Sequence, residues 1–325
     1  MPLELKIIIT IVSILVALIL IVLFFVLKIH SLMFEKRFDM DPLVTSYDDE
    51  KLNRENIKFD CDNVTLRGNI YSYPNMNYKG VIVFSHGMFS SHKSYMQEII
   101  FFANQGYIVL GFDYMGTALS DGNSLRGFGN SLKCLDYAVR FVKNNDNLNK
   151  YKIIVVGHSW GGFAASNILK YHDDIYKVVA LAPFSSIYRL LKGYSPKWLY
   201  PILPIMVWVD SLKCGKYSYA SNIKTLRNKD NFLVLHSKDD HMVKIEYNTL
   251  KLIKKNPKIK SIILDNKRHN PDYTYEAVKK LSEYSHLVKT LDEDEVIELK
   301  KNTDFLALGE LDKDIMNKIM DFIQE

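Results

Sequence analysis

The stretch KIIVVGHSWGGFAAS, residues 152–166, joins a strand-like run to a helix-like run through a serine set between glycines. Residues 153–156 form a β-branched run of the kind found in buried strands. A serine on so abrupt a strand-to-helix turn is held in a strained backbone conformation. A glycine two residues before Ser159 and another two residues after it leave room for such a turn. The stretch therefore predicts either an exposed nucleophilic serine or a tight glycine-rich connection in which the serine has no chemical role.

Strand-like and helix-like segments alternate on both sides of this stretch. Because the strand-like runs are apolar throughout, the pattern predicts an α/β fold in which a mostly parallel sheet has helices on both faces. An antiparallel pair of strands over residues 56–74 is expected to precede it. The expected parallel strands lie at 80–87, 107–116, 152–159, 177–184, 231–240 and 260–269, and the expected helices at 94–106, 130–145, 162–172 and 311–324.

Residues 185–225 break the alternation with a segment rich in aromatic residues and prolines. Segments inserted at the carboxyl edge of a parallel sheet commonly cover binding sites, so we expect a helical lid here. Its apolar side chains, among them Trp198, Ile205 and Trp208, are candidates for substrate contact. The other interpretation is an ordinary pair of helices packed on the core, and the sequence leaves both open.

An apolar run near the amino terminus, residues 7–27, contains no charge, proline or glycine. A helix needs about 20 residues to cross the ~30 Å hydrocarbon core of a bilayer, and this run is long enough. A cleaved signal peptide fits less well, because its apolar region usually has about 7–15 residues and an A-x-A-like cleavage site follows it. We therefore predict an uncleaved transmembrane anchor.

This anchor sets the predicted domain boundaries. Residues 1–38 form the anchor and its flank, residues 39–55 a polar linker, and residues 56–325 one catalytic domain that includes the lid. One lysine precedes the apolar run, whereas two lysines and one arginine follow it closely. This bias leans towards a cytoplasmic catalytic domain, although large domains are translocated regardless of such a small difference.

Composition excludes several other classes of protein. The net charge of +5 is modest and the lysines are scattered, which is not the concentrated basic patch of a nucleic-acid-binding protein. The cysteines, Cys61, Cys134 and Cys214, are few and far apart, without the spacing of a disulfide framework or a zinc site. We therefore expect no nucleic acid partner, no metal and no cofactor.

The ends of the predicted strands supply the groups that acyl transfer by a serine requires: a base, a carboxylate that orients it, and backbone donors for the oxyanion. Asp239 and Asp240 follow one strand, and His269 follows the next, in the chain order Ser, Asp, His. The backbone N–H groups of Met88 and Trp160 are the candidate oxyanion donors. Taken singly, each Asp or His is more often a turn or surface residue.

Residues 80–270 resemble the α/β-hydrolase superfamily of serine hydrolases, and especially its monoglyceride-lipase and lysophospholipase-like branch. Residues 157–161, GHSWG, resemble the G-x-S-x-G nucleophile elbow, and residues 86–88 resemble the H-G-x oxyanion turn. Residues 236–243, HSKDDHMV, are similar to H-G-x-x-D-x-x-V, which makes Asp240 the triad acid. His269 lies where the family carries its histidine.

The chain departs from the family pattern at four positions. Residues 113–120 are similar to the family's D-x-R-G-x-G-x-S loop, but Met115 and Ala118 replace its arginine and second glycine. Ser237 and Arg268 stand where glycine is usual. These residues are not the groups that transfer protons.

The resemblance implies an α/β-hydrolase fold and a membrane-anchored serine hydrolase with Ser159, His269 and Asp240 as its catalytic triad. The apolar lid beside an anchor favours acyl lipids, such as monoglycerides or lysophospholipids, as substrates. A carboxylesterase or a peptidase acting on small substrates is the alternative. A non-catalytic binding protein on a retained hydrolase fold is the third possibility.

Overall fold

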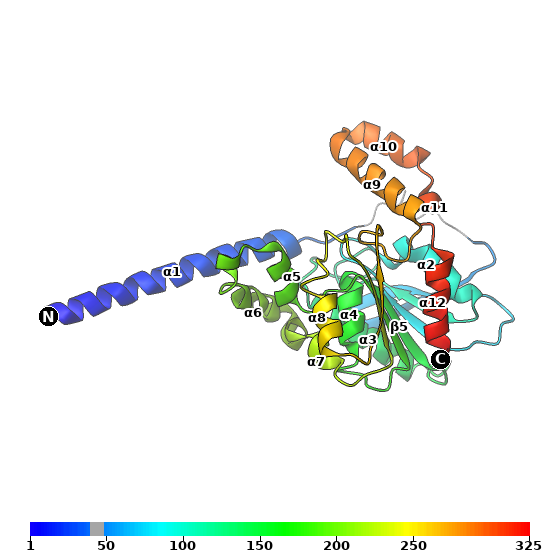
Figure 1. Cartoon of the computed structure of the whole chain (residues 1–325), viewed down its shortest axis with the longest axis horizontal. Helices are drawn as coiled ribbons and strands as arrows, with labels where there is room; N and C mark the ends of the chain where they lie inside the picture. Colours follow the sequence, from blue (N-terminus) through cyan, green and yellow to red (C-terminus); the bar gives the residue numbers. More distant parts are fainter. Residues whose placement is uncertain (40–48) are drawn as a thin grey trace.

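The computed structural model describes residues 1–39 and 49–325, arranged around one twisted sheet (Figure 1). Residues 40–48 of the predicted linker lie outside the described residues. The sheet has eight strands in the order β1-β2-β4-β3-β5-β6-β7-β8, parallel from β4 to β8, with β1 and β2 antiparallel at one edge. The strands are β1 (Asn53–Cys61), β2 (Val64–Ser72), β3 (Val81–Ser85), β4 (Ile108–Phe112), β5 (Ile153–His158), β6 (Lys177–Leu181), β7 (Phe232–Ser237) and β8 (Lys260–Leu264).

Helices cover both faces of this sheet, as predicted. On one face lie α3 (Asn130–Asn144), α4 (Trp160–Ile168) and α8 (Thr249–Lys255), and on the other lie α2 (Met96–Asn104) and α12 (Lys313–Gln324) (Figure 1). Successive residues of a strand point to opposite faces, so each central strand contributes to both cores. The sequence prediction of a mostly parallel α/β sheet is confirmed.

The amino-terminal helix α1 (Leu3–Phe34) is 32 residues long and extends away from the domain (Figure 1). Among the described residues it is the one helix long and apolar enough to cross a membrane. Its last turns are packed against the domain, where the side chains of Val26, His30 and Phe34 are buried. The end of the segment predicted as anchor and flank, residues 1–38, thus also contributes buried side chains to the domain.

The predicted lid, residues 185–225, is helical. It comprises α5 (Ile187–Tyr194), the 3₁₀ turn η3 (Lys197–Leu199), α6 (Leu203–Cys214), the 3₁₀ turn η4 (Gly215–Tyr219) and α7 (Asn222–Thr225). Helix α6 packs beside the end of α1 (Figure 1). One side of α6 is buried, as in a helix packed on the core, and the other side is exposed, as a lid would be. The segment thus has features of both the core-packed and the lid interpretation.

A helical hairpin follows the last strand and projects from the body (Figure 1). It consists of α9 (Tyr275–Thr290) and α10 (Glu293–Asn302), joined through a capping box at Asp292 and followed by α11 (Phe305–Leu308). No residue of α10 is buried, so α10 lacks the apolar face by which a core helix is recognised. The closing helix α12 has six buried apolar residues and confirms the prediction over 311–324.

Candidate active site

Ser159 lies on the sharp turn between β5 and α4. Its φ of 55° is in the left-handed region, which L-residues seldom adopt. The flanking glycines are required by close approach of the backbone. A Cβ atom on Gly157 would lie 2.3 Å from the carbonyl oxygen of Gly161, and one on Gly161 would lie 1.9 Å from that of Ser85. The strained turn predicted from the glycine spacing is therefore present.

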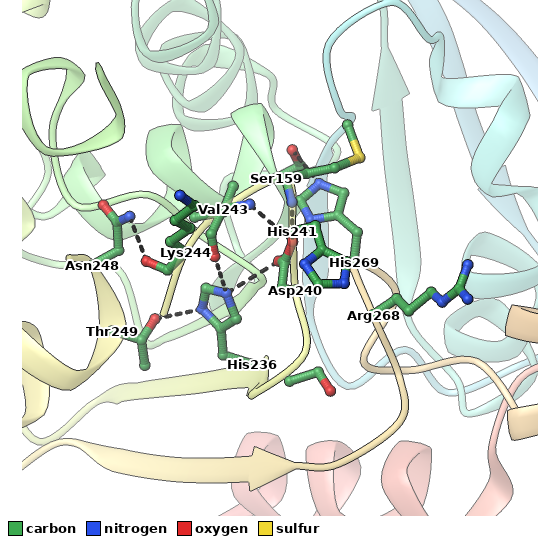
Figure 2. Close-up of polar contacts among 12 residues, drawn as sticks. Ser159, His236, Asp240, His241, Val243, Lys244, Asn248, Thr249, Arg268 and His269 are labelled. Carbon is green, nitrogen blue, oxygen red and sulfur yellow. Dashed lines mark hydrogen bonds and ion pairs between the residues drawn. The ribbon is translucent and has the colours of Figure 1, made fainter. Parts of the chain in front are cut away.

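Ser159, His269 and Asp240 form one chain of hydrogen bonds (Figure 2). Nε2 of His269 lies 2.7 Å from Oγ of Ser159, and Nδ1 of His269 lies 2.8 Å from Oδ2 of Asp240. Because an ionised carboxylate only accepts hydrogen bonds, Nδ1 carries the ring proton and donates a hydrogen bond to Asp240. The other ring nitrogen, Nε2, is then free to accept the hydroxyl proton of Ser159.

The carboxylate of Asp240 is held by several donors. Its Oδ1 accepts the backbone N–H groups of Met242 and Val243, both at 2.8 Å. Burial alone raises the pKa of this carboxyl, but hydrogen bonds from His236 and His269 outweigh burial and hold the pKa well below its ordinary value. Asp240 therefore remains charged at neutral pH.

His236 is a component of this site that the sequence analysis used only to align the motif. Its Nε2 lies 2.8 Å from the carbonyl oxygen of Val243 and 3.1 Å from Oδ2 of Asp240, and its Nδ1 lies 2.6 Å from Oγ1 of Thr249 (Figure 2). A carbonyl only accepts, so Nε2 carries the proton and also faces Asp240. His236 and Asp240 are four residues apart in the motif, but this spacing alone did not predict their contact.

Asp239, the competing acid, points to different partners. Its Oδ1 accepts hydrogen bonds from the Ser237 hydroxyl and, at 3.3 Å, from the backbone N–H of Arg268. The structure thus brings Asp240, and not Asp239, into contact with the imidazole of His269.

The two predicted oxyanion donors come from elements that meet at Ser159. Trp160 is the first residue of α4, where backbone N–H groups have no acceptor inside the helix. Met88 follows Gly87, and a Cβ atom built on Gly87 would lie 3.7 Å from Cβ of Ser159. The turn that carries Met88 therefore lies beside the nucleophilic position.

Solved structures share this arrangement of sheet and helices. The Pyrococcus furiosus esterase Pf2001 aligns over 83% of this chain and 97% of its own, with a TM-score of 0.55 and 18% sequence identity. The alpha/beta hydrolase GrgF from Penicillium sp. sh18 aligns over 84% of this chain and 98% of its own, with a TM-score of 0.54 and 16% identity. The chain has the α/β-hydrolase fold.

Sequence comparisons agree with this fold. Residues 76–225 of this chain match the family model described as "Serine aminopeptidase, S33". A curated protein of Mycoplasma pneumoniae, "Putative esterase/lipase 3", is 32% identical over 127 residues, which are 37% of this chain and 44% of that protein. The match thus spans less than half of the relative's length.

The departures from the family pattern now have a structural context. Ala118 and Arg268, which stand at positions expected to be glycine, have φ angles of 37° and 46°. Both lie in the left-handed region that favours glycine. The chain therefore has left-handed backbone at both positions although each carries a side chain.

A polar bridge behind Ser159 was not predicted. Nε2 of His158 lies 2.8 Å from the carbonyl oxygen of His269, and Nδ1 lies 2.8 Å from the hydroxyl of Tyr95. The same hydroxyl accepts the backbone N–H of Gly87 at 3.0 Å. Burial, with a contribution from nearby His269, lowers the pKa of His158 to about 3, so His158 stays neutral.

The predicted substrate-contacting residues of the lid lie largely towards solvent. Trp198 and Trp208 are exposed, and Ile205 is half-buried. A separate cavity of about 310 Å³ lies between α2 and the hairpin, with Asn270, the neighbour of His269, in its wall. Its lining includes none of Ser159, Asp240 and His269, so we do not assign the substrate to it.

Proposed function

We propose that this chain is a membrane-anchored serine hydrolase that cleaves carboxylic esters, with acyl lipids as its substrates. Ser159 is the nucleophile, His269 the general base and Asp240 the carboxylate that orients it. The observation that carries the proposal is the continuous hydrogen-bonded chain from Ser159 through His269 to Asp240. A curated relative described as a putative esterase/lipase and a structural neighbour described as an esterase support the same type of reaction.

The proposed reaction has two steps. Oγ of Ser159 attacks the ester carbonyl carbon while its proton moves to Nε2 of His269, and the resulting tetrahedral intermediate expels the alcohol, which takes that proton. Water then attacks the acyl-enzyme ester. Its proton moves to Nε2 of His269 and from there to Oγ of Ser159 as the carboxylic acid leaves.

Charge that develops on the carbonyl oxygen needs donors in fixed positions. We assign this role to the backbone N–H groups of Met88 and Trp160, which lie on two separate elements next to Ser159. One such donor is typically worth about 3–4 kcal/mol in the transition state. The positive end of the α4 dipole adds to the same effect at Trp160.

Acyl lipids are the proposed substrate class because the apolar lid lies beside a helix suited to a bilayer. Monoglycerides and lysophospholipids are the esters that the sequence resemblance favours. We further propose that α1 remains uncleaved and that the domain lies on the cytoplasmic side. A peptidase acting on small substrates is the second candidate, because the matched family model is described as a serine aminopeptidase.

A substrate panel tests this proposal with the full chain in lipid vesicles. The panel contains a monoglyceride, a lysophosphatidylcholine, a water-soluble short-chain p-nitrophenyl ester and an aminoacyl p-nitroanilide, each with Ser159→Ala as the control. We expect turnover of the esters, greatest for the two lipids, and loss of turnover in the variant. Cleavage of the anilide alone would favour the peptidase, and equal rates in the variant would contradict a serine mechanism.

A further inference from the structure

The end of α1 is joined rigidly to the lid. Nε2 of His30 lies 3.3 Å from Oδ1 of Asp210 on α6, and both side chains are buried. The ring of Phe34 packs edge-on against Phe128 with centroids 4.7 Å apart. Val26, His30 and Phe34 are four residues apart and so share one face of α1. The helix therefore docks on α6 and does not hang from a flexible tether.

Asp210 connects this contact to the body of the domain. Its carboxylate also accepts the backbone N–H groups of Phe128 at 2.6 Å and Gly129 at 3.1 Å, and the Ser218 hydroxyl at 2.5 Å. A carboxylate with donors from α1, from η4 and from the loop before α3 fixes all three together.

The chain stays attached to the domain after α1 ends. The backbone N–H of Phe38 donates to the carbonyl of Gly116, and the N–H of Ala118 donates to the carbonyl of Phe38, both at 2.9 Å. The ring of Phe38 lies 5.9 Å from that of Phe89, the neighbour of Met88. The oxyanion turn thus lies close to the point where the membrane helix enters the domain.

The length of α1 fixes the level of the lid relative to a bilayer. Residues 3–25 are largely exposed, and at about 1.5 Å per residue they span about 34 Å, close to the ~30 Å thickness of the hydrocarbon core. The docked turns begin directly afterwards, at Val26. With residues 3–25 across a bilayer, helix α6 would lie at the level of the headgroups on the side of the domain.

The outer face of the lid has the composition of an interfacial surface. Trp198 is 75% exposed, Leu212 59%, Tyr194 56% and Trp208 46%, whereas the third tryptophan of the chain, Trp160, is buried. Tryptophan and tyrosine prefer the boundary between headgroups and acyl chains. Large apolar side chains that are exposed together on one segment indicate a surface that contacts a membrane or another protein.

We propose that this outer face of the lid, formed by Tyr194, Trp198, Trp208 and Leu212, is a bilayer-contact surface. The side chains enter the interfacial region of the same leaflet from which α1 emerges. The ester group of a lipid then reaches Ser159 from the membrane, past the oxyanion turn, without crossing bulk water. This inference rests on the proposed function, because it takes α1 as a membrane anchor.

Tryptophan fluorescence of the full chain in phosphatidylcholine vesicles tests the surface. Trp208→Phe keeps Trp198 as the exposed reporter, and the double variant Trp198→Phe/Trp208→Phe gives the background of buried Trp160. We expect lipids brominated near the upper part of the acyl chain to reduce the Trp198 signal at least twofold, and aqueous iodide to have little effect. Iodide quenching without bromolipid quenching would overturn the proposal. Protection from both quenchers would also overturn it, because a protein would then cover the face.

Repeating the measurement in Ser159→Ala separates this inference from the proposed function. Bilayer contact does not depend on the nucleophile, so the same bromolipid quenching is expected in that variant. If the wild-type chain hydrolyses lipid esters while Trp198 stays in water, the proposal of a bilayer-contact surface is wrong and the proposed hydrolase function stands. If Trp198 is quenched but no ester is hydrolysed, the function is wrong and the surface stands. A chain that does not float with vesicles contradicts both.

Discussion

The hydroxyl of Tyr95 lies 2.8 Å from Nδ1 of His158, and this contact joins three loops of the candidate site. Since Nε2 of His158 faces the carbonyl oxygen of His269, Nε2 carries the proton and Nδ1 accepts from Tyr95. The tyrosine oxygen in turn accepts the N–H of Gly87. One tyrosine and one neutral histidine thus connect the turn that carries Met88, the turn that carries Ser159 and the loop that carries His269.

Replacing Tyr95 with phenylalanine removes both of these hydrogen bonds. Buried groups that lose their partners cost about 1–3 kcal/mol, and the loss falls on the positions of Gly87 and His269. We expect Tyr95→Phe to lower kcat for an ester about tenfold to a hundredfold with a smaller effect on KM. Tyr219→Phe, at an exposed tyrosine whose hydroxyl contacts Ser211, is the control and should change little. Unchanged kcat with a lower Tm would restrict Tyr95 to a structural role.

Asp240→Asn tests the orientation of the imidazole. An asparagine can present an N–H to Nδ1 of His269, which favours the tautomer that protonates Nε2 and leaves no acceptor for the Ser159 proton. We expect kcat to fall about 10⁴-fold with the fold retained. Asp239→Asn, one residue away and without contact to His269, should retain most activity. A larger loss in Asp239→Asn than in Asp240→Asn would reverse the assignment of the acid.

The turn that carries Ser159 permits no side chain at Gly161. A Cβ atom there would lie 1.9 Å from the carbonyl oxygen of Ser85, a contact that requires the backbone of β3 to move. We expect Gly161→Ala to destabilise the chain by about 3 kcal/mol or more and to abolish activity. Gly193→Ala, on α5 with its nearest neighbour at 3.7 Å, is the matched control and should leave Tm within a few degrees. A normal Tm in Gly161→Ala would show that the turn differs from the one described here.

A buried carboxyl pair beside the histidine loop predicts a pH dependence of stability. Burial raises the pKa of Asp272 to about 6, and burial together with nearby Asp272 raises that of Glu98. The native state therefore binds more protons than the unfolded state between about pH 4 and pH 6, so the free energy of unfolding falls as pH rises through this range.

Glu98→Gln should remove much of this dependence, because an amide stays neutral and can donate to Asp272. We expect the Tm of the variant to exceed that of the wild-type chain by a few degrees at pH 8 and to match it near pH 4. Thermal unfolding from pH 4 to pH 8 measures the effect, with Glu298→Gln, at an exposed position on α10, as the control. A Tm that falls equally at both pH values would contradict the role of ionisation.

The sheet and the proximity of Ser159, Asp240 and His269 were predictable because their signals are local. Apolar runs marked every parallel strand, and the carboxyl ends of such strands meet at one edge, which brings Asp240 and His269 to Ser159. The catalytic roles of these residues stay a prediction until they are tested. The fold itself is confirmed by the strand order and by the structural neighbours.

Contacts that depend on the conformation of a loop, or that join distant segments, were not predictable in this way. His236 reaches Asp240 because of how residues 237–243 turn, and Tyr95 meets His158 across 63 positions of sequence. The face of α1 that docks on the domain could not be predicted, because Val26 and Phe34 continue an apolar run that a membrane span alone would explain. Helix α10 gave no signal because a polar helix without a buried residue resembles any exposed segment.

Labelling with a fluorophosphonate probe tests most directly whether His269 activates Ser159. The full chain in vesicles is treated with the probe beside Ser159→Ala and His269→Ala, and the modified peptide is identified by mass spectrometry. We expect one label, on Ser159, that disappears in both variants. A folded wild-type chain that takes up no label, or takes it up on another residue, would contradict it.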